Sequence, residues 1–281
     1  MGMNAILRFC LIALAAVTFS GCQTGEDNFP RIINEPMPVP PAQRSSFGVI
    51  GILPADLAAH FEFGQPDSPG EAAGVIGTKA FVGLADSSMR SDEGHPGRQL
   101  GDIAFSAALA GVIGVFGSVL AGVPEGDVKR AQTAMSLALR DNPLEPGIQT
   151  RIQQLAVKKH CQNLVPVPET VRARLEDNAP AAEHLRTLAG SDIDSVLLIR
   201  VDDERFVPGT GLNPPMAVEI NLSIQIVRVS DGKVLFAKTL EYQGNRQPFT
   251  RWGANHAKLF RAELQIAQQT FAGVIFDELS N

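Results

Sequence analysis

Residues 218–226 limit the fold of this chain more than any other stretch. They read VEINLSIQI and alternate apolar and polar side chains without a fault, which predicts a β-strand with one buried face. The alternation changes phase at Ile226 and Val227, and this change predicts a β-bulge. The sequence SDGK follows at 230–233, and its central Asp-Gly pair predicts a hairpin turn. The chain then returns as a second strand, VLFAKTLEYQG.

Segments with helical spacing or apolar runs surround this hairpin. Strands are predicted at 47–55, 163–168 and 194–201. Two prolines confine the strand at 163–168, which places it at a sheet edge. The strand at 194–201 is almost continuously apolar, which places it in the sheet centre. Helices are predicted at 125–140, 145–161, 179–189 with Gly190 as C-cap, and 250 to about 279. The last helix has one apolar stripe, formed by Trp252, Leu259, Phe260, Ala267, Phe271, Val274 and Ile275.

This order of elements predicts a single α/β (α+β) domain over residues 47–281. Its core is a mixed sheet with a long C-terminal β-hairpin and helices packed on it. A Gly/Ala-rich helical hairpin is inserted at about 70–123, where 71–85 and 103–123 flank a polar break.

Residues 1–22, MGMNAILRFCLIALAAVTFSGC, have the layout of a secretory signal. A short region with Arg8 precedes an apolar run, and Ser20 and Gly21 precede Cys22. This ending resembles the lipobox of bacterial lipoproteins, although Phe19 stands where the family prefers Leu. The resemblance implies removal of the signal peptide 1–21 and lipidation of Cys22, with acyl chains such as palmitate as a stable membrane anchor.

The residue after the lipobox implies a location. Gln23 rather than Asp implies, by the same resemblance, a lipid-anchored protein of the outer membrane that faces the periplasm. An ordinary secretory signal or an uncleaved anchor is the alternative. Residues 22–46 are Pro-rich and lack periodicity, so we expect the lipidated Cys followed by an extended tether.

The cysteines allow no intrachain disulfide under this interpretation. Cys10 is removed with the signal and Cys22 is modified, so Cys161 remains alone. Cys161 follows His160, and adjacent helical positions point about 100° apart. We therefore interpret Cys161 as a buried structural thiol rather than as part of a metal or nucleophile pair.

The stretch IAFSAALAGVIGVFGSVLAGV at 103–123 has 21 residues and no charge. Every fourth position is small, so that a helix would present a face that another helix can approach closely. That predicted packing or oligomerisation face consists of Ser106, Ala110, Gly114, Ser118 and Gly122. The segment is long enough to cross a bilayer, but outer membranes mostly admit closed barrels. A packed or self-associating hairpin, a membrane-associated helix and a true span all stay open.

The C-terminal half, VEINLSIQIVRVSDGKVLFAKTLEYQG with the helix after it, resembles a domain of several envelope accessory lipoproteins. Examples are the curli-secretion channel lipoprotein, the lipoprotein activators of penicillin-binding proteins and the N-terminal domain of the Tol-system propeller protein. The segment is also similar to uncharacterised proteobacterial lipoproteins that pair it with a Gly-rich apolar segment. The likeness covers about half of the chain and lies in layout rather than in an invariant motif.

No pattern of residues points to catalysis or to a cofactor. The net charge of −6 and the dispersed Lys and Arg residues give no support to nucleic-acid binding, and none is expected. The histidines are scattered, which predicts no metal site, and GEAAGVIGTK lacks the Gly-Lys-Ser/Thr order of a phosphate loop. Solvated strand ends are the interpretation for five acidic residues: Asp192, Asp194, Asp202, Asp203 and Glu204.

These observations predict a non-enzymatic, lipid-anchored accessory or assembly protein that acts through contacts with an envelope partner. The alternative is a self-oligomerising, membrane-active component that uses helix 103–123. An envelope hydrolase with an unrecognised site is a third, weaker hypothesis. Phe249 and Trp252 either anchor a partner at the surface or pack the last helix onto the sheet, and packing is favoured.

Overall fold

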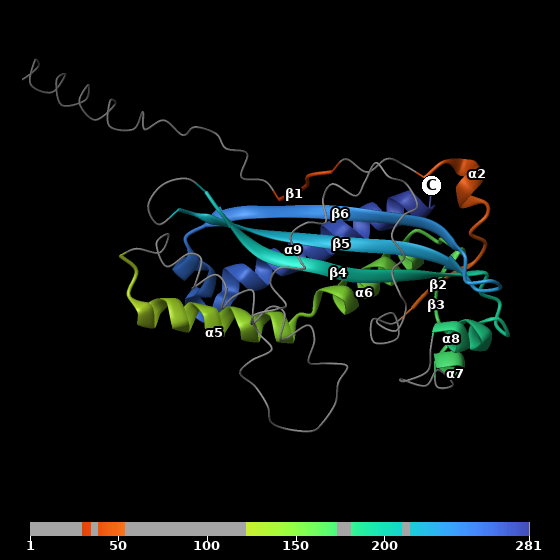
Figure 1. Cartoon of the computed structure of the whole chain (residues 1–281), viewed down its shortest axis with the longest axis horizontal. Coiled ribbons are helices and arrows are strands. Elements are labelled where there is room, and N and C mark those ends of the chain that lie inside the picture. Colours follow the sequence, from red (N-terminus) through yellow and green to blue (C-terminus); the bar gives the residue numbers. More distant parts are fainter. Residues whose placement is uncertain (1–29, 35–38, 54–121, 173–180, 210–213, 281) are drawn as a thin grey trace, which may run out of the picture.

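A computed structural model describes residues 30–34, 39–53, 122–172, 181–209 and 214–280. The signal peptide, Cys22 and most of the inserted hairpin lie outside these ranges. The described residues form a mixed sheet of six strands in the order β1-β6-β5-β4-β2-β3 (Figure 1). The predicted α/β fold is therefore confirmed. The strand bounds are β1 (Arg31–Ile32), β2 (Ile50–Ile52), β3 (Leu164–Pro166), β4 (Ser195–Pro208), β5 (Met216–Arg228) and β6 (Val234–Gln247).

The predicted hairpin forms the long part of this sheet. β5 pairs antiparallel with both β4 and β6, and β2 lies parallel to β3 and β4. The β5–β6 register shifts between Ile226 and Val227, which confirms the predicted bulge. β3 is an edge strand and β4 a central one, as predicted, but β4 extends seven residues beyond the predicted end at Val201, and β2 is much shorter than 47–55.

The turn between β5 and β6 is wider than a two-residue Asp-Gly turn. The Arg228 amide donates to the Lys233 carbonyl, and the Gly232 amide donates to the Arg228 carbonyl, both at 2.9 Å. Gly232 has a φ of +72°, whereas Asp231 does not enter the left-handed region that both central residues of a tight type I′ turn require. The loop between the two strands therefore spans residues 229–233.

Three helices cover one face of the sheet. They are α5 (Glu125–Asp141), α6 (Leu144–Lys158) and α9 (Phe249–Ser280). In Figure 1, α9 crosses behind the long strands, and α5 and α6 follow one another along the lower edge of the sheet. The apolar members of the β5 alternation, such as Ile220, Leu222 and Ile224, are buried against these helices. The periodicity thus predicted correctly which face of the hairpin is buried.

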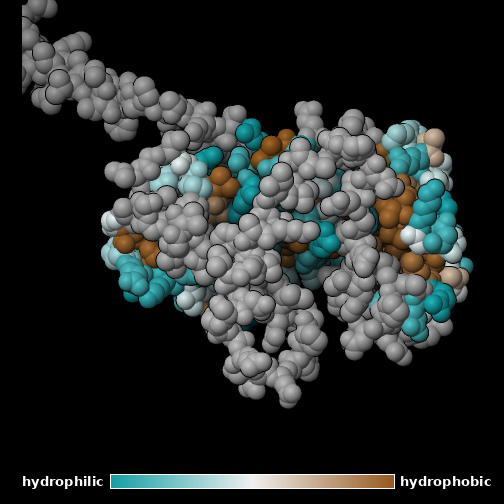
Figure 2. Space-filling model, viewed as in Figure 1, coloured by the Kyte–Doolittle hydropathy of each residue, from teal (hydrophilic) through white to brown (hydrophobic). Residues whose placement is uncertain are grey.

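A smaller apolar cluster lies near the β2–β3 end of the sheet. It includes residues of α7 (Glu169–Arg172) and α8 (Ala181–Leu188), such as Val171 and Leu188, with Val196 and Leu198 of β4. Leu197 and Ile199 of β4 belong to the main core. Alternate residues of this strand therefore lie in the main core on one face of the sheet and in the smaller cluster on the other. Apolar residues are visible at this end of the molecule in Figure 2.

The segment predicted to be a tether is partly built into the domain. Arg31 and Ile32 pair with Gln243 and Tyr242 as strand β1, and Val39 and Phe47 are 2% and 1% exposed. Helix α2 (Pro41–Arg44) lies between these two side chains in sequence. The described part of the domain therefore includes residues before 47, starting with β1. The physical reason is that β6 would otherwise be an edge strand with unpaired backbone groups.

Asn34 extends the pairing at this edge through its side chain. Its Nδ2 donates to the Thr239 carbonyl at 2.6 Å, and its Oδ1 accepts from the Glu241 amide at 2.8 Å. Gln43 similarly donates from Nε2 to the Leu235 carbonyl at 2.8 Å. Side-chain amides thus satisfy three backbone groups of β6 that a neighbouring strand would otherwise pair.

The last helix is interrupted. Ala254 is extended, and Asn255, His256 and Ala257 have φ between +52° and +58°, so the predicted continuous helix consists of a short segment and a long one. Leu259 follows the interruption and is 40% exposed, although the predicted stripe includes it. It precedes the buried Phe260 by one residue and therefore points about 100° away from that side chain. Val274 is half-buried. The other stripe members are buried: Trp252, Phe260, Ala267, Phe271 and Ile275.

Candidate functional site

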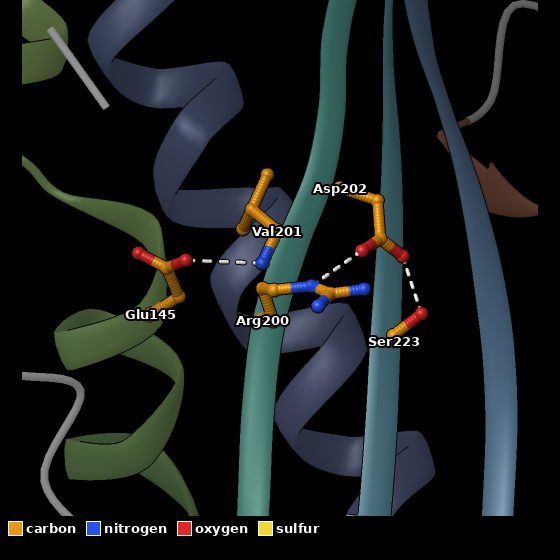
Figure 3. Close-up of polar contacts among 5 residues, drawn as sticks. All are labelled: Glu145, Arg200, Val201, Asp202 and Ser223. Atoms are coloured by element: carbon orange, nitrogen blue, oxygen red, sulfur yellow. Dashed lines mark hydrogen bonds and ion pairs between the residues drawn. The ribbon is translucent and has the colours of Figure 1, made fainter. Parts of the chain in front are cut away.

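A polar cluster marks the point where β4 bulges. The β4–β5 register shifts between Val201 and Asp203, which leaves Asp202 as the extra residue. Asp202 Oδ1 accepts from Arg200 Nε at 2.7 Å, and Asp202 Oδ2 accepts from the Ser223 hydroxyl (Figure 3). Because Asp202 has no partner residue on β5, its carboxylate can contact side chains of both β4 and β5.

Glu145 approaches the same bulge from the helical layer. It lies in the first turn of α6, where the partial positive charge of the helix favours a carboxylate. Its Oε1 accepts from the Val201 amide at 3.0 Å (Figure 3). Burial raises the pKa of Glu145, and the Val201 amide opposes that change; the Asp202 carboxylate also raises it.

Glu204 is the second carboxyl on this side. It pairs with Ile220, a residue of the main core, so the bulge turns Glu204 toward the helix-covered face. Burial raises the pKa of Glu204 to about 8, and the Glu145 and Asp203 carboxylates add to this effect. The cluster therefore retains a proton near neutral pH, which makes it a pH-sensitive part of the fold.

After the bulge, ion pairs form on the face of the sheet that points away from Glu204 and the helices. The Arg205 guanidinium contacts Glu219, and it lies 3.4 Å from an Asp203 oxygen. The sequence predicts a solvated strand end at Asp202, Asp203 and Glu204. That interpretation is wrong, because β4 continues through them to Pro208. It holds for the other two acidic residues of the group, since Asp192 and Asp194 are exposed.

Phe249 and Trp252 are not a surface anchor. Each is 1% exposed, and their rings lie 5.8 Å and 6.3 Å from the Phe206 ring, centroid to centroid. Trp252 Nε1 donates to the Met216 carbonyl at 2.9 Å. The packing interpretation is therefore confirmed and the partner-anchor interpretation is wrong, because the start of α9 folds under β4 and β5.

The other predicted site residues lie mostly outside the described ranges: Cys22, Ser106, Ala110, Gly114 and Ser118. Gly122 is described, and it contradicts the prediction that it continues a helical face. It lies in a turn with a φ of +92°, a left-handed value that does not occur within a right-handed helix. The small-residue face therefore does not extend to Gly122.

Cys161 and His160 form no site together. Both follow the end of α6; Cys161 is half-buried against the main core, and His160 is exposed. Within the described ranges, no group of three or more His, Cys, Asp or Glu side chains is arranged to hold a metal ion. No helix in the part of the chain that the structure describes combines the length and apolar character needed to cross a membrane.

Sequence reasoning missed the proximity of Glu145 and Glu204. The two residues are far apart in sequence, and Glu204 stands in an acidic run that is typical of solvent-exposed positions. Only the extra residue Asp202 turns Glu204 inward. The alternation of apolar residues over 201–206 could have indicated the bulge. Val201 and Phe206 both face the helices, but they are five positions apart, whereas residues on one face of a regular strand are an even number apart.

The fold and this cluster define an α/β domain whose sheet carries its main helical layer on one face. No protein-family model matches the chain, and no curated protein matches it. Among solved structures, it is similar to a variant of the PelC dodecamer from Paraburkholderia phytofirmans, at 13% identity over 48% of this chain and 75% of that one, with a TM-score of 0.27. It is also similar to the hypothetical protein CT253 from Chlamydia trachomatis, at 10% identity over 47% and 80%, with a TM-score of 0.31. Likeness at this level does not extend to function.

Proposed function

We propose that the chain is a lipid-anchored accessory or assembly protein of the bacterial envelope that faces the periplasm and acts through protein contacts rather than catalysis. The observation that carries the proposal is the position of Cys22. It ends a signal-like segment with the lipobox layout and stands shortly before strand β1.

The distance along the chain determines how far the domain extends from an anchor at Cys22. Residues 23–30 separate Cys22 from Arg31. A fully extended chain spans at most about 3.6 Å per residue, so the two residues lie at most about 32 Å apart. Because β1 is paired with β6 and extended by Asn34, the anchor would hold the β6 edge close to the membrane. Such a short connection suits a protein that meets its partner beside the bilayer.

Two carboxylates at the β4 bulge are engaged in structural contacts. The Asp202 carboxylate is bound by Arg200 and Ser223, and Glu145 is bound by the Val201 amide. These contacts orient carboxylates toward backbone and neighbouring side chains rather than toward an open reactive group. They support a role through binding rather than through chemistry.

The anchor is tested by labelling and fractionation. We expect the wild-type chain to incorporate a palmitate analogue and to fractionate with outer membranes, and Cys22→Ser to lose the label and appear in the soluble periplasmic fraction. Cys161→Ser is the matched control and should keep both properties. An unlabelled wild-type chain, or Cys22→Ser that keeps the label, would overturn the lipid anchor.

The second candidate function rests on the small residues Ser106, Ala110, Gly114 and Ser118. A membrane-active helix at 103–123 would keep Cys22→Ser in the membrane fraction. Adding Gly114→Leu and Ser118→Leu to that variant would then change its oligomer size. Release of Cys22→Ser into the soluble fraction excludes this candidate as the means of attachment.

A further inference from the structure

The surface of α9 that faces away from the sheet is uncharged over about four turns. Along it, Leu259 and Ile266 are 40% and 37% exposed, and Ala262 and Gln269 are exposed between and beyond them. The charged residues within this stretch point elsewhere: Arg261 pairs with Asp141, and Glu263 is buried against β6. Large apolar side chains thus face solvent on a helix whose other faces are covered.

Two exposed charges stand at the ends of this surface. Lys258 is at the start of the regular part of α9 and Asp277 is near its end, and both are exposed. Neither makes an ion pair within the described part of the chain. A helix favours negative charge at its N-terminus and positive charge at its C-terminus, so both charges have the unfavourable sign for their own helix.

Gly273 on the same surface has no role in the described domain. A Cβ at this position would meet nothing within 4 Å, although glycine inside a helix costs about 0.5–1 kcal/mol relative to alanine. A small residue at an open position allows another helix to come close.

These positions are related by symmetry. Lys258 and Asp277 lie equally far from a point between residues 267 and 268, and the same holds for Ala262 with Gly273 and for Ile266 with Gln269. We propose that the outer surface of α9 binds the same surface of a second copy of this chain, with the two helices antiparallel. A two-fold axis at that point brings each Lys258 to Asp277 of the other copy.

The proposed contact matches side chains by size as well as by charge. Ala262 faces Gly273 of the second copy, which permits close approach, and the exposed Ile266 packs along the stem of Gln269. Leu259 is covered near the end of the pair. An interface built from one helix pair is small, so we expect a concentration-dependent dimer rather than an obligate one.

Zero-length cross-linking of the full chain in detergent with a carbodiimide tests this arrangement. Within one copy, Lys258 and Asp277 are separated by about 28 Å along the helix, so a peptide that joins them by an amide bond comes from two copies. We expect this cross-linked peptide by mass spectrometry, in a dimer whose amount rises with protein concentration. Its absence at every concentration would overturn the proposal.

Charge reversal makes the test specific. Lys258→Glu alone and Asp277→Lys alone should each abolish the dimer, because each variant places like charges at both ends of the pair. An equimolar mixture of the two variants should restore it, since opposite charges then meet at both ends. Failure of the mixture to restore cross-linking between the two introduced side chains would contradict the antiparallel register.

Two further variants test whether the dimer depends on this surface of α9 or on exposed hydrophobic residues elsewhere. Gly273→Leu fits the open space of the single domain and should fold, but it should abolish the dimer by keeping the helices apart. Val157→Lys changes the most exposed large hydrophobic residue of the described chain, on α6, and should leave the dimer intact. A dimer that survives Gly273→Leu, or one that is lost with Val157→Lys, would refute this surface.

Discussion

The Tyr242 hydroxyl on β6 donates a hydrogen bond of 2.6 Å to Glu263 Oε1 on α9. The same oxygen accepts from the Asn245 amide at 3.1 Å, and Glu263 is 4% exposed. Toward the other end of α9, Lys238 of β6 pairs with Glu278, and both side chains are largely buried. The last helix is therefore attached to β6 by polar contacts at two places as well as by its apolar stripe.

Tyr242→Phe should destabilise the domain. Burial and the Glu263 carboxylate raise the pKa of Tyr242, so the hydroxyl remains a donor at neutral pH, and its removal leaves a buried carboxylate with fewer partners. We expect the free energy of unfolding in urea to fall by about 1–3 kcal/mol. In a Glu263→Gln background, the same substitution should cost less, because the buried group is then neutral. Equal costs in both backgrounds would show that the hydrogen bond contributes little.

Gly253→Ala should lower the free energy of unfolding, although it adds only one methyl group. A Cβ at Gly253 would lie 2.2 Å from the Cα of Ala131 on α5, and backbone cannot move aside as a flexible side chain can. We expect a loss of at least about 2 kcal/mol, measured by thermal or urea unfolding. Gly126→Ala in α5 is the matched control: its Cβ would meet Arg130 at 3.6 Å, so it should be neutral or slightly stabilising. Comparable losses for both variants would contradict the close helix crossing.

Glu204→Gln should change how stability depends on pH. Burial raises the folded-state pKa of Glu204 from its ordinary value of 4.5 to about 8, so the folded chain binds an extra proton between these two pH values. The contribution of this bound proton to the free energy of unfolding is fully present below about pH 4.5 and is lost as the pH rises through 8. The variant should therefore gain stability over the wild type between pH 5 and pH 8, by roughly 1–2 kcal/mol once the partial exposure of the side chain is considered. A constant difference across this range would contradict the raised pKa.

Trp252 provides an intrinsic probe of the packing of α9. It is the single tryptophan of the chain and is 1% exposed, so native fluorescence should be blue-shifted and resistant to acrylamide. The emission should shift to the red in the same transition as the loss of far-ultraviolet ellipticity. Ready quenching in the native state would instead indicate a surface tryptophan and would contradict the described contact with Phe206.

The fold class and most of the described elements follow from local patterns. The alternation at 218–226 predicts the buried face of β5, and the phase change at Ile226 predicts its bulge, because strand periodicity depends only on neighbouring residues. Helical spacing likewise predicts α5, α6 and the long part of α9. Pro166 and Pro168 restrict their strand to an edge for a reason that is equally local.

Long-range contacts decide the rest. The sequence by itself determined which of the longer segments are strands and helices and which of their faces are apolar. Only the tertiary structure decided that Arg31 pairs with Gln243, that Trp252 is buried beneath Phe206, and that Glu204 lies close to Glu145. Each of these depends on which distant segment supplies the partner, and side-chain periodicity within one segment carries no information about that choice.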